Sequence, residues 1–240
     1  MDFLRGVAIL MMVAYHTLFL LNYFDGYKLT LLTGFWHLFQ ITTASIFIFL
    51  AGVSLTLSSS RAGQAKAVNP LPRQLKHGLV IFALGLIITM GTRLFLGQNF
   101  VRFGILHLIG LSVILAYPFR KGQRPALLIG IICIGVGAFF KNCLPDFPPG
   151  WLFWLVFLKS HYRATVDYFP LLPWFGVVLL GVGFGNLVYQ NRRRGFYLPD
   201  LSDTPLIKPV RFLGRHALVV YFLHPPTLLG IMYLSGIIRR

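Results

Sequence analysis

Residues 3–23 read FLRGVAILMMVAYHTLFLLNY, an almost wholly apolar run in which Arg5 and His16 are the only basic side chains. About 20 apolar residues cross a bilayer as a helix, so this run predicts a transmembrane helix. Further runs of this kind, bounded by charge, proline or glycine, cover 33–57, 76–96, 103–119, 125–141, 169–189 and 212–236. The sequence therefore predicts an all-α integral membrane protein, a bundle of about seven transmembrane helices.

The composition supports the same fold class. Of the 240 residues, 56% are hydrophobic and 12% are charged, and the mean hydropathy is +0.73, whereas soluble domains contain about 25% charged residues. These values exclude a soluble globular protein. The 22 Lys and Arg residues against 6 acidic residues give a net charge of +16. In so apolar a chain this excess indicates membrane topology, so we expect the lipid bilayer as a partner and no nucleic acid.

The basic residues gather between alternate apolar runs, as the positive-inside rule requires. With the N-terminus in the cytoplasm, 14 of the 22 basic residues lie on the cytoplasmic side of the plasma or cytoplasmic membrane, and the C-terminus lies outside. The inner set is Arg5, Arg61, Lys66, Arg73, Lys76, Arg120, Lys121, Arg124, Arg192, Arg193, Arg194, Lys208, Arg211 and Arg215. The apolar stretch 151–158 is too short to span, so we expect an interfacial or re-entrant segment there.

No internal repeat or soluble appendage interrupts this pattern, so we expect a single domain over 1–240. Cys133 and Cys143 are too few for a disulfide framework and lack the spacing of metal ligands, so both are interpreted as packing residues and no metal site is expected. The 24 glycines favour close contacts between helices and are compatible with a homodimer.

One face of the first predicted helix carries polar groups. Asp2, Arg5, Ile9, Met12 and His16 follow one another in steps of three and four residues and therefore share a face. Asp2 and Arg5 are spaced for an ion pair, and His16 lies roughly 16 Å deeper along the axis than Arg5. Ionisable groups at membrane depth mark functional sites. The alternative is a snorkelling arginine with a histidine that bonds a neighbouring helix.

A second polar feature occurs in the last apolar run. His224 lies near mid-membrane and is followed by Pro225 and Pro226, which interrupt the helical hydrogen bonds and free carbonyl groups. A kink beside a buried histidine favours a cavity. We expect an outward-facing polar pocket lined by His16, His107, His224, Arg93 and Asp167.

Two of the candidate residues have plain alternatives. Asp167 precedes the sixth run and is equally well explained as a helix N-cap. His37, in Gly34-Phe35-Trp36-His37, fits an interfacial aromatic belt as well as a pocket.

The opening motif carries a family resemblance. Asp2-Phe3-Leu4-Arg5-Gly6-Val7-Ala8 with His16 resembles the first-helix signature of the membrane acyltransferases of family 3. Arg73-Gln74-Leu75-Lys76 resembles their cytoplasmic Arg-x-x-Arg element, with Lys in the last place.

More of the chain resembles the related heparan-alpha-glucosaminide N-acetyltransferase catalytic family. Besides the opening motif, the matching segments are FIFLAGVSL (47–55), FGILH (103–107), VDYFPLLPW (166–174) and Gly214-Arg215-His216 through His224-Pro225. The animal enzymes carry a histidine in the loop after the first helix, whereas 24–33 contains none, so His16 resembles the family-3 histidine instead.

This resemblance implies a membrane enzyme that transfers an acyl group, most simply acetyl, from cytoplasmic acyl-CoA to an amino or hydroxyl group of a sugar or glycan on the other side. Acyl-CoA is then a co-substrate, and no permanently bound cofactor is expected. For such a transfer the predicted catalytic residues are His16, as general base or acyl carrier, with Asp167 and His107, which bind sugar hydroxyls or orient His16. The phosphates of CoA need fixed positive charge, and the predicted CoA-binding residues are Asp2, Arg5, Arg73, Lys76, Arg120, Lys121, Arg124 and Arg215.

Two other functions fit the same polar residues. A transporter or lipid flippase would use the His and Arg residues as a path and the kinked last helix as a gate. A b-type haem or quinone protein would use paired histidines as ligands.

Overall fold

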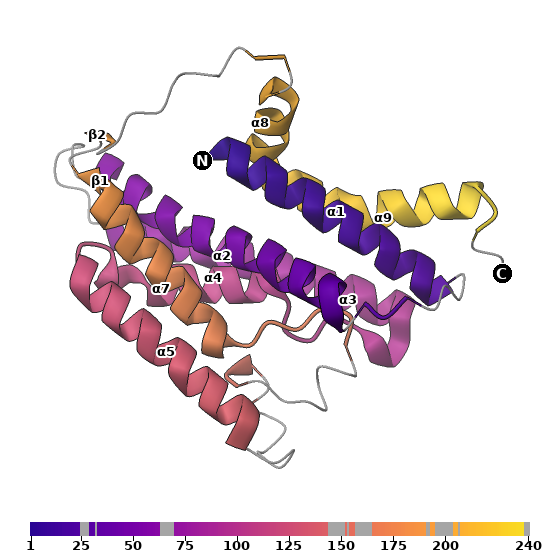
Figure 1. The fold of residues 1–240 in the computed structure, drawn as a ribbon, viewed down its shortest axis with the longest axis horizontal. Coiled ribbons are helices and arrows are strands. Elements are labelled where there is room, and N and C mark those ends of the chain that lie inside the picture. Colours follow the sequence, from indigo (N-terminus) through magenta and orange to yellow (C-terminus); the bar gives the residue numbers. More distant parts are fainter. Residues whose placement is uncertain are drawn as a thin grey trace. The chain divides into compact units, whose positions relative to one another are not determined.

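In the computed structural model nearly all of the described chain is helical (Figure 1). The structure describes residues 1–24, 29–31, 33–62, 70–143, 152, 154–156, 165–190, 193–194, 204–205 and 207–237. The helices pack into two compact units, of which the first is Met1–Phe47 with Leu198–Arg240 and the second is Ile48–Tyr197. Whether these units belong to one domain, as predicted, stays a prediction.

The first unit is built on α1 (Asp2–Phe24), which lies alongside α8 (Ile207–Arg215) and α9 (Ala217–Leu234) (Figure 1). The start of α2 (Gly34–Ala62) also belongs to it. Glycines set the distance between α1 and α8, because a Cβ at Gly6 would collide with the Val210 carbonyl and one at Gly214 would collide with the Asp2 carbonyl. The close approach keeps the Arg215 end of α8 beside the start of α1.

The second unit contains the rest of α2 and two antiparallel helix pairs. Its elements are α3 (Pro70–Leu96), η1 (Gly97–Asn99), α4 (Ile105–Leu115), η2 (Tyr117–Phe119), α5 (Gln123–Cys143), α7 (Leu171–Val188), and the strands β1 (Tyr189–Gln190) and β2 (Arg193–Arg194). The Gln74 amide donates to the Val113 carbonyl at 2.6 Å, which joins the start of α3 to the end of α4. α5 and α7 meet at Gly130 and Gly176, where a Cβ on either would touch the other backbone. The predicted use of glycines at helix contacts is confirmed at these positions.

Six helices of the described chain are long and apolar enough to cross a membrane. They cover Asp2–Phe24, Gly34–Leu57, Leu71–Asn99, Gln123–Asn142, Leu171–Val188 and Ala217–Leu234. The predicted fold class, an all-helical integral membrane protein, is therefore confirmed.

The predicted run 103–119 differs from the others. It contains α4, which has only 11 residues and is therefore about 16 Å long, roughly half the thickness of the hydrocarbon core. The helix is followed by η2, with Pro118 inside it. Most of its residues are buried within the unit, among them Leu106, His107 and Leu108. Protein of the same unit therefore covers much of this run.

The predicted run 212–236 is divided at His216, whose backbone leaves the helical conformation between α8 and α9. α8 carries Lys208, Arg211 and Arg215 within nine residues, which suits a membrane surface better than the hydrocarbon. The span itself is therefore Ala217–Leu234.

Several sequence predictions fall wholly or partly outside the described residues. Of 151–158 only Leu152, Trp154, Leu155 and Val156 are described, in a turn that ends with Val156 buried. Its place at the membrane interface stays a prediction. Lys66, Arg192, and the Cys143 side chain also lie outside the described part, whereas Cys133 is a half-buried free thiol on α5, as a packing residue would be.

Candidate functional site

The start of α1 forms a small charged cluster. Asp2 lies in the first turn, where the helix dipole favours a carboxylate. Its Oδ1 is 3.2 Å from Nη1 of Arg5, and its Oδ2 is 3.5 Å from Nε of Arg215 on α8. The predicted Asp2–Arg5 pair is confirmed, and Arg215 joins it because α8 packs so closely. Two guanidinium groups on one carboxylate leave a net positive charge, which suits an anionic ligand.

Farther along the same face of α1, His16 meets His224 of α9. Nδ1 of His16 lies 2.7 Å from Nε2 of His224. The rings are within 16° of parallel and their centres are 4.8 Å apart. Stacked rings approach no closer than about 3.5 Å between atoms, so the 2.7 Å contact means that the rings meet edge to edge, as a hydrogen bond requires. We call these two residues the histidine pair.

The His224 ring is also anchored on its own helix. It is 7% exposed, and its Nδ1 lies 2.7 Å from the Tyr221 carbonyl and 3.3 Å from the Val220 carbonyl. The histidine pair thus joins α1 and α9 of the first unit, through two residues that the sequence placed in one pocket.

His107 is bonded at both ring nitrogens. The backbone N–H of Gly104 donates to its Nδ1 at 3.2 Å. Because that nitrogen accepts, the hydrogen of the neutral ring lies on Nε2, which is 3.4 Å from Oγ1 of Thr89. The Thr89 hydroxyl in turn donates to the Val101 carbonyl at 2.7 Å. His107 is 2% exposed and closes the first turn of α4.

Asp167 binds the same helix start from outside. Its Oδ2 accepts a hydrogen bond from the backbone N–H of Ile105 at 3.2 Å. A Cβ at Gly104 would collide with this carboxylate, so the close approach needs a glycine. The alternative explanation of Asp167 as a helix cap is therefore correct in kind, although the capped helix is α4. We call Thr89, Gly104, His107 and Asp167 the α4 cap.

The remaining pocket candidates, Arg93 and His37, have other surroundings. Arg93 places its guanidinium group 5.0 Å from the centre of the Phe100 ring, and Arg102 places its own 5.4 Å from the same centre. His37 lies on α2 in the first unit, and its buried Nδ1 has no hydrogen-bond partner among the described residues. The prediction that His16, His224, His107, Asp167 and Arg93 line one pocket stays a prediction, because the histidine pair and the α4 cap belong to different units.

The predicted CoA-binding residues fall into two groups. Asp2, Arg5 and Arg215 belong to the first unit. The others lie at one end of the second unit, since the Gln74–Val113 bond places the start of α3 beside the chain that leads through η2 to α5. This group is Arg73, Lys76, Arg120, Lys121 and Arg124, of which Arg120 stacks on the Tyr117 ring at 4.3 Å.

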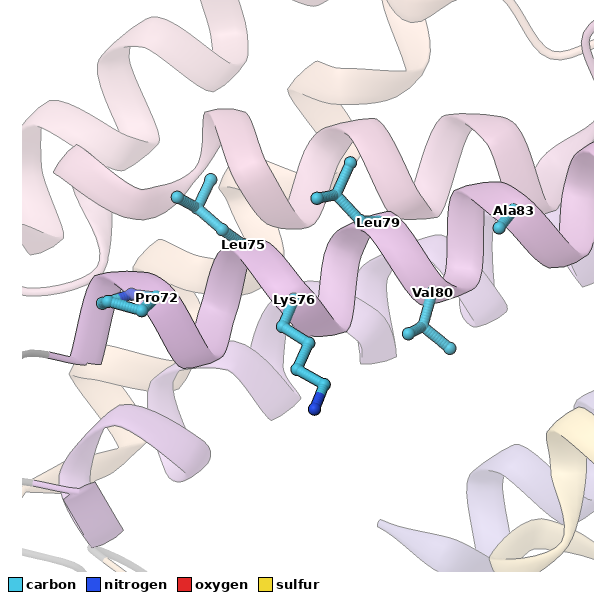
Figure 2. Close-up of a pocket in the computed structure, with 6 residues that line it drawn as sticks. All are labelled: Pro72, Leu75, Lys76, Leu79, Val80 and Ala83. Atoms are coloured by element: carbon cyan, nitrogen blue, oxygen red, sulfur yellow. The ribbon is translucent and has the colours of Figure 1, made fainter.

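A shallow apolar hollow runs along α3 next to this basic end. The described residues that line the hollow are Pro72, Leu75, Lys76, Leu79, Val80 and Ala83, all from α3 (Figure 2). Figure 2 shows the Lys76 side chain extending away from α3. Since all of the described lining residues come from one helix, the hollow is an open surface feature.

Sequence reasoning missed Thr89 and Gly104 as members of the α4 cap. Neither residue is ionisable, and only the packing of α3 on α4 brings Thr89 to the histidine. In the described segments no three or more His, Cys, Asp or Glu side chains are grouped as metal ligands.

The fold and these contacts define a polytopic membrane protein with a hydrogen-bonded histidine pair inside its helices. The family model described as heparan-alpha-glucosaminide N-acetyltransferase, catalytic, matches residues 1–226. The chain therefore belongs to this family of membrane acetyltransferases, and the predicted resemblance is confirmed. No curated protein and no solved structure matches the chain.

Proposed function

We propose that the protein transfers an acyl group, most simply acetyl, from cytoplasmic acyl-CoA to an amino or hydroxyl group of a sugar or glycan on the other side of the membrane. Membership in the family supports acetyl transfer. The observation that carries the chemical step is the histidine pair, with Nδ1 of His16 2.7 Å from Nε2 of His224. A histidine with one ring nitrogen held in this way presents its other nitrogen to a substrate.

The charged cluster at the start of α1 is proposed to bind phosphate groups of CoA. Asp2 holds Arg5 and Arg215 side by side, and guanidinium groups match phosphate oxygens in geometry and charge. His16 lies roughly 16 Å farther along the helix than Arg5. An extended pantetheine arm fits this direction, with phosphates at the cytoplasmic surface and the thioester inside the membrane. The second basic group, at the starts of α3 and α5, is a second candidate for binding the CoA phosphates.

The chemical step uses His16 as a base. The acceptor nitrogen or oxygen attacks the thioester carbonyl carbon, so that a C–N or C–O bond forms and the C–S bond breaks. His16 takes the proton that the acceptor loses and returns it to the thiolate, which leaves as CoA–SH. Acylation of His16 itself, followed by transfer to the acceptor, would use the same nitrogen.

His107 and Asp167 receive a different proposed role. Both ring nitrogens of His107 are occupied and Asp167 binds the Ile105 N–H. We assign them to holding the start of α4, on the side where the acceptor is expected to bind. In this proposal they are positioning residues.

Acetyl transfer is tested with the purified protein in lipid nanodiscs, radiolabelled acetyl-CoA and a panel of amino sugars. Label is expected in an amino sugar with wild-type protein and with His77→Ala, which alters an exposed histidine of α3. His16→Ala is expected to lose transfer and to keep acetyl-CoA binding. Wild-type transfer by His16→Ala would disprove the assignment, and solute movement into vesicles without acyl transfer would favour a transporter.

A further inference from the structure

The last membrane span contains a carbonyl group for which a proline stands in the place of the usual backbone donor. In an α-helix the carbonyl of each residue accepts from the N–H four residues later. The residue four positions after Tyr221 is Pro225, which has no N–H. The same holds for Phe222 and Pro226. An unpaired carbonyl at membrane depth costs several kcal/mol as an order of magnitude, so a side-chain donor nearby is strongly favoured.

His224 supplies that donor. Its Nδ1 lies 2.7 Å from the Tyr221 oxygen. A carbonyl oxygen only accepts, so Nδ1 of His224 must carry a hydrogen. In the neutral ring the other nitrogen, Nε2, then has a lone pair and no hydrogen.

The ring nitrogen that carries the hydrogen in His224 determines which ring nitrogen carries it in His16. Nε2 of His224 is the atom that faces Nδ1 of His16 at 2.7 Å. Since Nε2 accepts, Nδ1 of His16 donates, and the lone pair of His16 lies on Nε2, at the far side of its ring. None of the described residues forms a hydrogen bond with that nitrogen.

The neutral form of the pair is favoured by its surroundings. One more proton would place a positive charge on two rings among apolar helices, and none of the described carboxylates pairs with either ring. An unpaired charge in such a place is costly.

We propose that His224 is a positioning residue: the carbonyl freed by Pro225 holds its ring, and the ring fixes His16 with hydrogen on Nδ1 and a lone pair on Nε2. The last link, that Nε2 of His16 takes the acceptor's proton, rests on the proposed function. The tautomer of His16 does not rest on the proposed function, because it follows from the hydrogen bonds among the Tyr221 carbonyl, the His224 ring and the His16 ring. After proton uptake, Nδ1–H of His16 still donates to His224, so the ring keeps its place through the reaction.

The two prolines provide a matched pair of variants. Pro225→Ala gives the Tyr221 carbonyl a backbone donor that competes with His224, whereas Pro226→Ala gives one to the Phe222 carbonyl, which His224 does not use. Alanine is the better helix former, so both variants are expected to fold. The ring nitrogens are observed by NMR of the intact protein in nanodiscs with 15N-labelled histidine, and the signals are assigned by single histidine replacements.

In wild type and Pro226→Ala, hydrogen is expected on Nδ1 of both His16 and His224. In Pro225→Ala the two signals are expected to shift toward a mixture of tautomers. The kcat for acetyl transfer is expected to fall about 10- to 100-fold, while KM for acetyl-CoA stays the same. His224→Gln keeps an acceptor for His16 and is expected to retain more activity than His224→Phe, which keeps only the ring shape.

Three outcomes separate the inference from the proposed function. Hydrogen on Nε2 of His16 in wild type, or equal spectra for the two proline variants, would overturn the role of His224 even if acetyl transfer occurs. The expected tautomer without transfer to any acceptor would leave the positioning intact and remove the proposed function. The expected tautomer with transfer that depends on Pro225 supports both.

Discussion

The histidine pair and the α4 cap hold their histidines in opposite ways. In the pair, three of the four ring nitrogens of His16 and His224 have partners among the described residues, and the fourth, Nε2 of His16, has none. In the cap, both nitrogens of His107 have partners. A buried histidine is therefore not a proton acceptor merely because it lies at membrane depth. Whether a ring nitrogen is left without a hydrogen-bond partner distinguishes a candidate base from a structural histidine.

The difference originates in the backbone next to each ring. His107 lies in the first turn of α4, where backbone N–H groups donate, so its Nδ1 accepts. His224 precedes a proline pair that supplies no N–H to the carbonyls four residues earlier, and its Nδ1 donates to the Tyr221 carbonyl. A helix start and a proline kink thus select opposite tautomers.

The largest expected effect is on catalysis, and it tests directly whether His16 and His107 have different roles. His16→Ala should lower kcat for acetyl transfer by about 10²- to 10⁴-fold, because it removes the proposed proton acceptor. His107→Ala should act on stability instead, by about 1–3 kcal/mol, because it leaves the Gly104 N–H unpaired. Single-turnover kinetics and thermal unfolding in nanodiscs measure the two effects. A His107→Ala protein that is as stable as wild type but inactive would place His107 in the chemistry.

A glycine substitution tests whether the α4 cap is as tight as described. Gly104→Ala adds a Cβ against the Asp167 carboxylate and should cost about 1–3 kcal/mol of unfolding free energy. Gly91→Ala is the matched control, because its Cβ meets nothing within 4 Å. That control should be neutral or slightly stabilising. Equal unfolding temperatures for both variants would show that the carboxylate is not held against Gly104.

The sequence predicted the spans better than the contacts between them. Hydropathy located the apolar runs, but it reports that a run is apolar and not what covers it, so it could not show that the run 103–119 contains a helix of 11 residues, most of them buried. Hydropathy also did not show that the run 212–236 divides into two helices. The charged residues of α8 are spaced in an amphipathic pattern, so the mean hydropathy of the whole run stays apolar.

For the candidate site, the sequence predicted which residues are neighbours along one helix but not which residues meet between helices. The i, i+3 spacing predicted the Asp2–Arg5 pair. The approach of Arg215 depends on glycines that let α8 touch α1. The sequence shows that Pro225, four residues after Tyr221, cannot donate to the Tyr221 carbonyl, but the contact with Nδ1 of His224 follows only from the rotamer of His224.

A smaller effect separates the charge of Asp167 from its capping role. Asp167→Ala removes the acceptor of the Ile105 N–H and should cost about 1 kcal/mol, as the loss of a helix cap does. Asp167→Asn keeps an oxygen in that place and should lose less. Thermal unfolding of both variants measures the difference. If Asp167→Asn is stable and fully folded but transfers no acetyl group, the carboxylate acts on the acceptor and not only on α4.

The smallest expected effect concerns the charged cluster, because its ion pairs are partly exposed. Asp2→Asn releases Arg5 and Arg215 from the carboxylate that holds them. Exposed pairs of this kind contribute about 0.2–1 kcal/mol, so acetyl-CoA affinity should fall by up to about fivefold while kcat stays the same. Arg124→Gln tests the other basic group, the second candidate for the phosphates, and leaves this cluster intact. Titration with acetyl-CoA and with dephospho-CoA distinguishes the two, since a cluster that binds the 3′-phosphate loses its preference for CoA over dephospho-CoA when Asp2 is replaced. An unchanged preference in Asp2→Asn and a lost one in Arg124→Gln would move the 3′-phosphate to the second unit.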